Sequence, residues 1–341
     1  MQTLNIGFLG TGGIATAYAK PLAQMPGVRV SALCNRTLDK AKRFNDTHLA
    51  GSAACYDDFD RMLANESLHG LFVCMPPGAH SGQAEKAARR GVHLMLEKPI
   101  ALTIDRAESI RAAVREKSVV CQIGHHFRHT GPVRKLKQML IDGTAGRPLM
   151  LQARFYLNGL FPAWWRDPQM GGGQLIEQSI HLYDLARHVF GDAIAVAGFA
   201  DKLAHERFDD YRVDDASASV IRFRNGGIAS ISACNLWEPA SGSVTFDIMC
   251  EKLLARFSSP TEAEFVYHGG RKSEEVRRDK IEIQRETIRS DGHYAELARN
   301  FIAAIRGEEP TRSTIDDGVE GLRLVLAVAS SSAAGGAVQS L

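Results

Sequence analysis

The sequence predicts an α/β protein that combines a doubly wound parallel sheet with a second α/β domain built on a large, mostly antiparallel open sheet. Three observations indicate this class. Short apolar runs alternate with amphipathic stretches over the first third of the chain, as in a parallel sheet with crossover helices. A glycine-rich turn follows the first apolar run. After Gly124, strand-like runs follow one another without helices between them, which indicates antiparallel pairing.

The expected N-terminal strands are almost continuously apolar, which is typical of a parallel sheet that helices cover on both faces. We expect these strands at Leu4–Leu9, Val28–Cys34, Gly70–Cys74, Val92–Leu96 and Val119–Ile123, with helices at Ile14–Gln24, His80–Arg90 and Ile104–Lys117.

The remainder of the chain predicts a second domain. The dipeptide Asn225-Gly226 between two strand-like runs is a strong hairpin signal. We place the first domain at residues 1–123 and the second at 124–341, with a solvated loop and edge strand at 270–289. Strands are expected at Leu149–Leu157, Ala218–Arg224, Gly227–Cys234, Val244–Cys250 and Leu253–Phe257, and helices at Pro132–Asp142, Leu175–Phe190, Tyr294–Arg306 and Asp317–Ser332.

The composition is that of an ordinary globular protein. The chain has 341 residues, of which 45% are hydrophobic and 23% charged, a length that suggests two domains. The 41 basic and 39 acidic residues leave a net charge of +2, which gives no electrostatic footprint for nucleic acid. No apolar run is long enough for a membrane helix.

The cysteine pattern favours a reducing compartment. None of the six cysteines forms a C-x-x-C pair, so we expect neither a zinc site, nor any other metal, nor a redox dithiol. The chain passes from Met1 directly into a strand pattern without a basic segment, so no signal peptide is expected. These features together predict a cytoplasmic protein.

The first strand leads into a dinucleotide-binding fingerprint. Gly10-Thr11-Gly12-Gly13-Ile14-Ala15 has the form G-x-G-x-x-A. The first glycine permits a tight turn, Gly12 lets a pyrophosphate approach the backbone, and the following helix start offers unpaired N–H groups. The alternative is a glycine-rich turn that binds no ligand.

The end of the second strand bears on which cofactor is used. An NAD site usually has an acidic residue about 20 residues after the glycines, where it binds the ribose hydroxyls. This chain has Asn35 there, followed by Arg36. Since Asn35 does not repel a phosphate and Arg36 can pair with one, we favour NADP over NAD. The alternative is an NAD site read by Asn35 with Arg36 on the surface.

The run Glu97-Lys98-Pro99 follows the expected strand at Val92–Leu96. Open α/β sheets bind ligands at the carboxyl ends of their strands, where Lys98 can donate a hydrogen bond to a substrate oxygen. Pro99 restricts the backbone and is a candidate for a cis peptide bond. The structural alternative is a surface ion pair followed by a turn.

Together these motifs resemble those of the glucose–fructose oxidoreductase, inositol dehydrogenase and rhizopine-catabolism (Gfo/Idh/MocA) family. The resemblance spans the whole chain and includes the turn Cys74–His80, the segment Gly171–Asp184, the hairpin near Asn225 and the closing helices. It implies a Rossmann-type domain, NAD(P) as cofactor and oxidation or reduction of a sugar or cyclitol carbon. The cofactor residues implied by the motifs are Gly10, Thr11, Gly12, Gly13, Ile14, Asn35, Arg36, Cys74, Pro76, His80, Glu97 and Lys98.

The resemblance also implies the catalytic residues Lys98, Glu177 and His181. On a regular helix, Glu177 and His181 share one face because they are four residues apart. An imidazole titrates near neutral pH, which suits proton transfer. The family commonly has Asp where this chain has Glu177. Without the resemblance, a core-facing histidine is the favoured interpretation of His181.

Further substrate-binding candidates surround this set. His126 and Arg128 fall where the family often has Asn and Arg, although a linker ion pair is the alternative for Arg128. Asp184 can orient the imidazole or contact substrate. Aromatic rings at Trp164 and Trp165 can stack on a sugar, and Arg166 can bind a carboxylate or hydroxyl; the alternative for these three is an interface.

The sequence therefore predicts an NAD(P)-dependent oxidoreductase in which Lys98 polarises the reacting oxygen and His181 moves its proton. Two alternatives stay open: an enzyme of the same fold that retains NAD to hydrolyse or isomerise glycosides, and a dinucleotide-sensing regulator. We expect no nucleic-acid or membrane partner. Alternating apolar residues in Ile228–Cys234 and Phe246–Cys250 suggest a homodimer or homotetramer through the C-terminal sheet.

Overall fold

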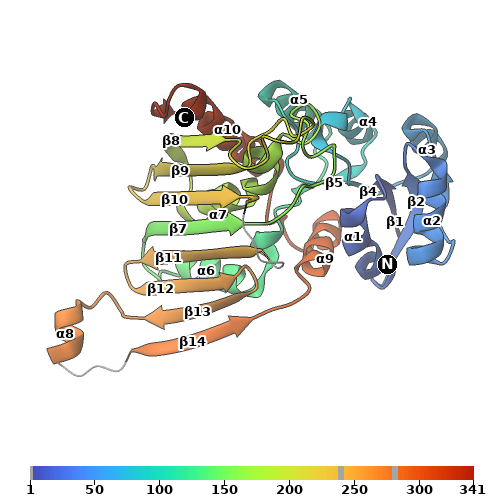
Figure 1. Cartoon of the computed structure of the whole chain (residues 1–341). Helices are drawn as coiled ribbons and strands as arrows, with labels where there is room; N and C mark the ends of the chain where they lie inside the picture. The colour runs from blue at the N-terminus through green and yellow to red at the C-terminus, as the bar shows by residue number, and fades with distance from the viewer. Residues whose placement is uncertain (1–2, 237–241, 279–282) are drawn as a thin grey trace. The chain divides into compact units, whose positions relative to one another are not determined.

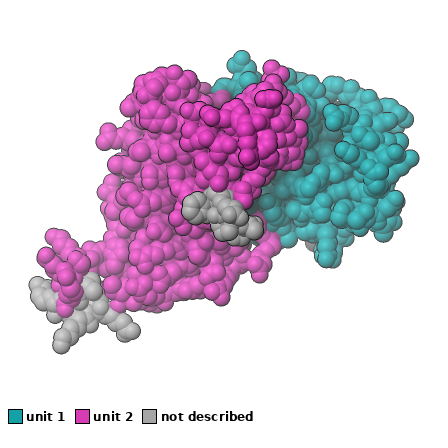
Figure 2. Space-filling model, in the orientation of Figure 1, with its two compact units in different colours: residues 1–126, 294–322 teal, residues 127–293, 323–341 magenta. Residues whose placement is uncertain are grey.

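The computed structural model describes residues 3–236, 242–278 and 283–341. The chain forms two compact units, residues 1–126 with 294–322 and residues 127–293 with 323–341 (Figure 2). The sequence predicts that everything after residue 123 belongs to the second domain. The structure instead returns residues 294–322 to the first unit, because α9 (His293–Ile305) buries Leu297 and Phe301 in the core of that unit.

The first unit contains a six-stranded parallel sheet (Figure 1). The strand order is β3-β2-β1-β4-β5-β6. The chain extends the sheet from β1 to one side through β2 and β3, and then to the other side through β4, β5 and β6. Doubly wound sheets bind ligands at the point where this direction changes. The strands are β1 (Leu4–Leu9), β2 (Val28–Cys34), β3 (Ala54–Tyr56), β4 (Gly70–Val73), β5 (His93–Leu96) and β6 (Cys121–Ile123). The connecting helices are α1 (Gly13–Ala23), α2 (Leu38–Leu49), α3 (Phe59–Asn65), α4 (Gln83–Arg89) and α5 (Ile104–Lys117).

Helix α1 illustrates how the sequence builds this unit. It buries Ala15, Tyr18, Ala19 and Leu22, a spacing that places all four on one helical face. These side chains join Ile6 and Phe8 of β1 in the core. The helix therefore lies directly against the strand that leads into it, and its first turn follows the glycine-rich segment.

The second unit contains a nine-stranded sheet in the order β14-β13-β12-β11-β7-β10-β9-β8-β15. All neighbouring strands pair antiparallel except β7 and β10, which are parallel. The mostly antiparallel sheet is confirmed. The strands are β7 (Pro148–Tyr156), β8 (Ala193–Asp201), β9 (Ala216–Phe223), β10 (Ile228–Cys234), β11 (Ser243–Cys250), β12 (Leu253–Ser259), β13 (Glu262–Tyr267), β14 (Gln284–Arg289) and β15 (Gln339–Ser340).

Helices cover one face of this sheet (Figure 1). Helices α6 (Gly131–Ile141) and α7 (Ile180–Phe190) pack Leu136, Leu182 and Leu185 against strand residues such as Leu151 and Ile231. Helix α10 (Ile315–Ala333) contributes to this core through its second half. Along β9 and β10, buried residues alternate with more exposed ones, so the opposite face is open.

The predicted hairpin at Asn225-Gly226 is confirmed. It joins β9 and β10, with Gly226 at a φ of +88° and the Phe223 N–H donating to the Gly227 carbonyl at 2.9 Å. The loop expected before β14 contains the short helix α8 (Ser273–Arg278). No helix in the described ranges combines the length and apolar composition that a bilayer span requires.

Candidate functional site

The glycine turn after β1 leaves open space at the start of α1. Gly10 has a φ of +93°, and a Cβ there would lie 2.3 Å from the Cys74 carbonyl oxygen, so any larger residue is excluded. At Gly12 and Gly13, by contrast, an added Cβ would meet nothing within 4 Å. The first backbone N–H groups of α1 are therefore accessible, and this turn fits a dinucleotide pyrophosphate.

Asn35 lies at the end of β2 and is engaged within the turn itself. Its Nδ2 donates to Thr11 Oγ1 at 2.7 Å, and its Oδ1 accepts the Thr37 N–H at 3.0 Å. The Arg36 side chain is exposed. The adenosine end of the predicted cofactor site therefore carries the exposed guanidinium of Arg36. At the position where NAD sites usually have a carboxylate, it has the amide of Asn35.

The turn after β4 carries Cys74, Pro76 and His80. Burial of Cys74, together with the nearby Glu97 carboxylate, raises the pKa of its thiol, which is therefore neutral at pH 7. Burial lowers the pKa of His80 to about 4, so this imidazole is also neutral. The turn thus presents no charge of its own beside the glycine turn.

Glu97 is the buried anchor of the Glu97-Lys98-Pro99 motif. It is 8% exposed, and its Oε1 accepts a 2.5 Å hydrogen bond from the hydroxyl of Tyr18. The backbone N–H of Lys98 donates to Oε2 at 3.3 Å. A Cβ at Gly124 would lie 2.8 Å from this carboxyl group, which explains a glycine there.

These contacts and its burial make Glu97 an interior carboxylate and not a surface one. The carboxylate of Glu97 fixes the backbone at the carboxyl end of β5, where Lys98 is half-buried and precedes a cis peptide bond to Pro99. Tyr18 carries no signal of this contact in the sequence, because its place on the apolar face of α1 is that of an ordinary core residue.

The segment that carries Glu177 and His181 is not one continuous α-helix. The single helix predicted over Leu175–Phe190 is wrong, because residues Gln174–Gln178 form a π-helical turn and α7 begins only at Ile180. The Ser179 hydroxyl donates to the Leu175 carbonyl at 2.7 Å in this wider turn. Single π-turns occur frequently at functional sites. The four-residue spacing alone therefore does not place Glu177 and His181 on one face.

Each of these two side chains has an aromatic neighbour. Trp165 Nε1 donates to Oε2 of Glu177 at 2.8 Å. The ring of His181, which is 5% exposed, packs against Phe127 with a centroid distance of 5.0 Å and lies 6.5 Å from Phe155. Both residues therefore contact aromatic side chains of the second unit, which belong to two different clusters.

Asp214 anchors the start of the π-turn. Its Oδ2 accepts the Leu175 N–H at 2.8 Å. Desolvation, with a smaller contribution from Asp215, raises the pKa of the Asp214 carboxyl to about 7. The sequence gives no signal for Asp214, since an Asp-Asp pair before a strand is typical of a loop. Asp214 is therefore a titratable group that binds the backbone of the turn carrying Glu177.

The remaining predicted substrate residues each contact a different partner. Arg128 pairs with Asp184, whereas the ring of His126 packs on Tyr294 with a centroid distance of 5.0 Å. Arg166 pairs with Asp210, Nη2 to Oδ2 at 2.7 Å, and is 15% exposed. As substrate contacts, all of these residues stay predictions.

Family models match both parts of the chain. The model described as "Oxidoreductase family, NAD-binding Rossmann fold" matches residues 4–125, and the GFO/IDH/MocA C-terminal domain matches residues 133–255. Levoglucosan dehydrogenase of Pseudarthrobacter phenanthrenivorans is 27% identical, covering 73% of this chain and 72% of its own. The scyllo-inositol 2-dehydrogenase (NAD(+)) of Bacillus subtilis is 25% identical, covering 66% and 65%.

Solved structures share the fold over almost the full length. Levoglucosan dehydrogenase in complex with NADH and levoglucosan superposes with a TM-score of 0.89 at 20% identity, covering 99% of both chains. The WlbA dehydrogenase from Bordetella pertussis, in complex with NADH and UDP-GlcNAcA, gives 0.82 at 20% identity, covering 100% of this chain and 99% of the other. On the two family matches, the chain belongs to the Gfo/Idh/MocA family of oxidoreductases with an NAD-binding Rossmann fold.

Proposed function

We propose that this chain is an NAD(P)-dependent dehydrogenase or reductase that transfers a hydride between nicotinamide and a secondary alcohol or ketone carbon of a sugar, cyclitol or related polyol. One observation carries the proposal: the buried Glu97 carboxylate is held by Tyr18 and in turn holds the Lys98 backbone at the carboxyl end of β5. The relatives named dehydrogenases of levoglucosan and inositol support this class of substrate.

We assign Lys98 the role of the hydrogen-bond donor to the reacting oxygen. In the oxidation direction, His181 accepts the hydroxyl proton and the Lys98 ammonium stabilises the negative charge that develops on the same oxygen. Bound nicotinamide supplies the hydride acceptor, which is the cofactor's own chemistry. We assign Glu177 to a neighbouring substrate hydroxyl. Because Arg128 and Asp184 are buried and paired with each other, we assign both to support of α7 and keep direct substrate contact as the less favoured role.

We propose NADP as the preferred cofactor. The support is the exposed Arg36 side chain and the neutral Asn35, whose two polar groups bind Thr11 and Thr37 within the turn. A guanidinium is well suited to pair with the 2′-phosphate of NADP. The relatives named above carry NAD(+) or NADH in their names or structures. The preference for NADP is therefore proposed from Asn35 and Arg36 of this chain alone.

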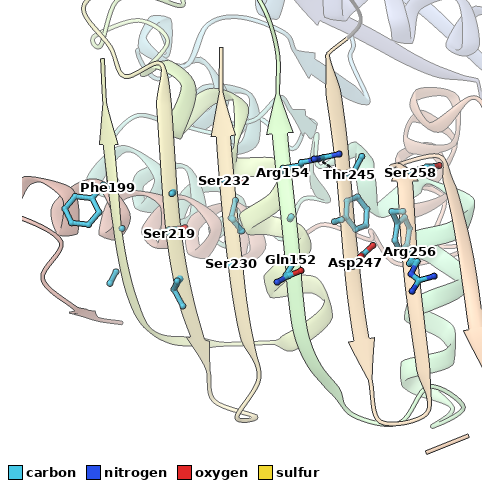
Figure 3. Close-up of a pocket in the computed structure, with 18 of the residues that line it drawn as sticks. Gln152, Arg154, Phe199, Ser219, Ser230, Ser232, Thr245, Asp247, Arg256 and Ser258 are labelled. Carbon is cyan, nitrogen blue, oxygen red and sulfur yellow. Dashed lines mark hydrogen bonds between the residues drawn. The ribbon is translucent and has the colours of Figure 1, made fainter. Parts of the chain in front are cut away.

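We further propose that the open face of the nine-stranded sheet binds a second copy of this chain. The face is lined by side chains of β7 to β12 (Figure 3). It exposes large apolar side chains, with Phe199 61% and Val220 55% exposed, beside charges of both signs such as Arg154 and Asp247. A surface of mixed charge that carries apolar residues is suited to self-association across a two-fold axis. Light scattering should show a dimer or tetramer that Val220→Lys dissociates, whereas a monomeric wild type contradicts this proposal.

A turnover screen tests the proposed reaction. Purified protein is mixed with NADPH or NADH and a panel of keto-sugars and oxidised cyclitols, and with NADP⁺ or NAD⁺ and the corresponding polyols. The proposal predicts cofactor-dependent absorbance change at 340 nm with at least one polyol or its ketone. Cofactor binding without turnover of any member contradicts it. Stoichiometric NAD released only by denaturation identifies the cofactor-retaining alternative instead.

A further inference from the structure

We propose that Trp165 is a positioning residue for Glu177. Its indole N–H donates to Oε2 of Glu177 at 2.8 Å, although the tryptophan itself is only 2% exposed and lies twelve residues earlier in the chain. This inference rests on the proposed function, which assigns the Glu177 carboxylate to a substrate hydroxyl. The indole acts on the reaction only through that carboxylate.

Trp165 is fixed by the packing of its own loop. Its ring lies 4.6 Å from that of Phe161, centroid to centroid, and 6.4 Å from that of Tyr211. The chain then folds back over it: a Cβ at Gly171 would lie 2.6 Å from the Trp165 Cα and 2.8 Å from its carbonyl oxygen. Gly171 is therefore required for the close return of the chain, and the indole has little freedom to reorient.

A second loop, residues 208–215, contacts the loop that carries Trp165. The Arg212 N–H donates to the Arg166 carbonyl at 3.1 Å, and two crossed ion pairs join the segments, Arg166 with Asp210 at 2.7 Å and Arg212 with Asp167 at 2.8 Å. Surface ion pairs individually contribute little to stability. Here they flank a continuous aromatic cluster, so the two loops form one packed body around Trp165.

The same second loop also fixes the backbone that carries Glu177. Asp214 accepts the Leu175 N–H at the start of the π-turn, and Val213 lies so close to Gly173 that an added Cβ would be 2.5 Å away. Val213 belongs to the aromatic cluster of Trp165 as well. The donor and the acceptor of the indole–carboxylate bond are therefore both positioned by the segment 208–215, which sets their geometry.

The chemistry of the two groups explains what this contact achieves. An indole can only donate, so it stabilises the ionised carboxylate and one of its rotamers without competing for a substrate proton. A carboxylate held in this way accepts a hydrogen bond from a polyol hydroxyl with little loss of side-chain entropy. If Trp165 only filled the core, its substitution would affect packing, and any effect on KM would not depend on Glu177.

A double-mutant cycle separates positioning from packing. Trp165→Phe keeps an aromatic ring and removes the N–H. We expect it to raise KM for the sugar or polyol roughly tenfold with little change in kcat, and to leave the Kd for NADPH unchanged. In the Glu177→Ala background the same change should have no further effect on KM. Tyr267→Phe, which removes a hydrogen bond to the Glu286 carboxylate at the edge of the sheet, is the control and should leave KM unchanged. Additive effects of Trp165→Phe and Glu177→Ala overturn the proposal.

A measurement without substrate distinguishes failure of this inference from failure of the proposed reaction. Glu177→Ala should change the tryptophan fluorescence of the protein, because the indole N–H of Trp165 loses its acceptor. In the Trp165→Phe background the same substitution should leave the remaining fluorescence unchanged. No change in the presence of Trp165, or a change of equal size in both backgrounds, overturns the inference, even if turnover is found. A change confined to the protein that has Trp165 supports the inference, even if the screened sugars are not turned over.

Discussion

Arg128 and Asp184 form a buried ion pair in the second unit, with Nε and Nη2 of the guanidinium 2.9 and 2.6 Å from the two carboxylate oxygens. Arg128 is 4% exposed and Asp184 only 1%. Asp184 lies three residues after His181 on α7, so the pair joins that helix to the turn that precedes α6. Two residues that the sequence assigned to substrate are thus held by each other.

Removing either partner of this pair should destabilise the protein strongly, because it leaves the other charge buried. We expect Arg128→Met or Asp184→Leu alone to lower the free energy of unfolding by about 3–5 kcal/mol. The double variant should recover part of that loss, since a buried apolar pair replaces the ionic one. Urea denaturation measures both effects. Single variants as stable as the wild type would show that the pair is solvated in solution.

Asp214 should make the stability of the protein depend on pH. Its folded pKa of about 7 lies above the ordinary value of 3.8, because burial disfavours the carboxylate. Between these two values the folded state binds more protons than the unfolded state, so stability falls as the pH rises from about 4 to 7.

Asp214→Asn should remove this contribution while it keeps an acceptor for the Leu175 N–H. We expect the stability of the variant relative to the wild type to be higher at pH 8 than at pH 4 by on the order of 4 kcal/mol. Denaturation curves of the two proteins at both pH values provide the test. An unchanged difference between them across this range means that Asp214 titrates normally.

Arg36 should determine the choice of cofactor. Since a charge-assisted hydrogen bond contributes about 1.5–3 kcal/mol, Arg36→Ala should weaken NADPH binding roughly 10- to 100-fold and leave NADH binding unchanged. Arg43→Ala changes an exposed arginine on α2, after the turn that carries Arg36, and as the control it should change neither affinity. Calorimetric titration with both cofactors decides, and an intact NADPH preference in Arg36→Ala would refute the proposed role.

Local patterns were sufficient to predict most of the fold. The strand at Leu4–Leu9 and the helix at Ile104–Lys117 have the predicted bounds, since apolar runs and periodic apolar residues reflect burial directly. Helix α2 was missed because its twelve residues are mostly polar and only Ala41, Phe44, Asn45 and Leu49 are buried. Strand β8 was missed because its small residues, Ala-Ile-Ala-Val-Ala-Gly, lack a clear alternation.

The site was predictable only as far as short motifs reach. The glycine turn and the segment Glu97-Lys98-Pro99 are local signals that can be recognised in one sequence. The contact of Tyr18 with Glu97 joins residues 79 positions apart, and no periodicity encodes it. The π-turn at Gln174–Gln178 depends on the Asp214 and Ser179 hydrogen bonds, which are tertiary and local backbone contacts that propensities do not describe.

The rate of hydride transfer in Lys98→Met tests the central claim most directly. Loss of a donor to the developing negative charge should lower kcat about 100- to 1000-fold, while the Kd for NADPH stays within about threefold of the wild type. Stopped-flow absorbance with the substrate found in the screen measures the first quantity, and fluorescence titration measures the second. Turnover by Lys98→Met at the wild-type rate would contradict the assignment of Lys98 to the reacting oxygen.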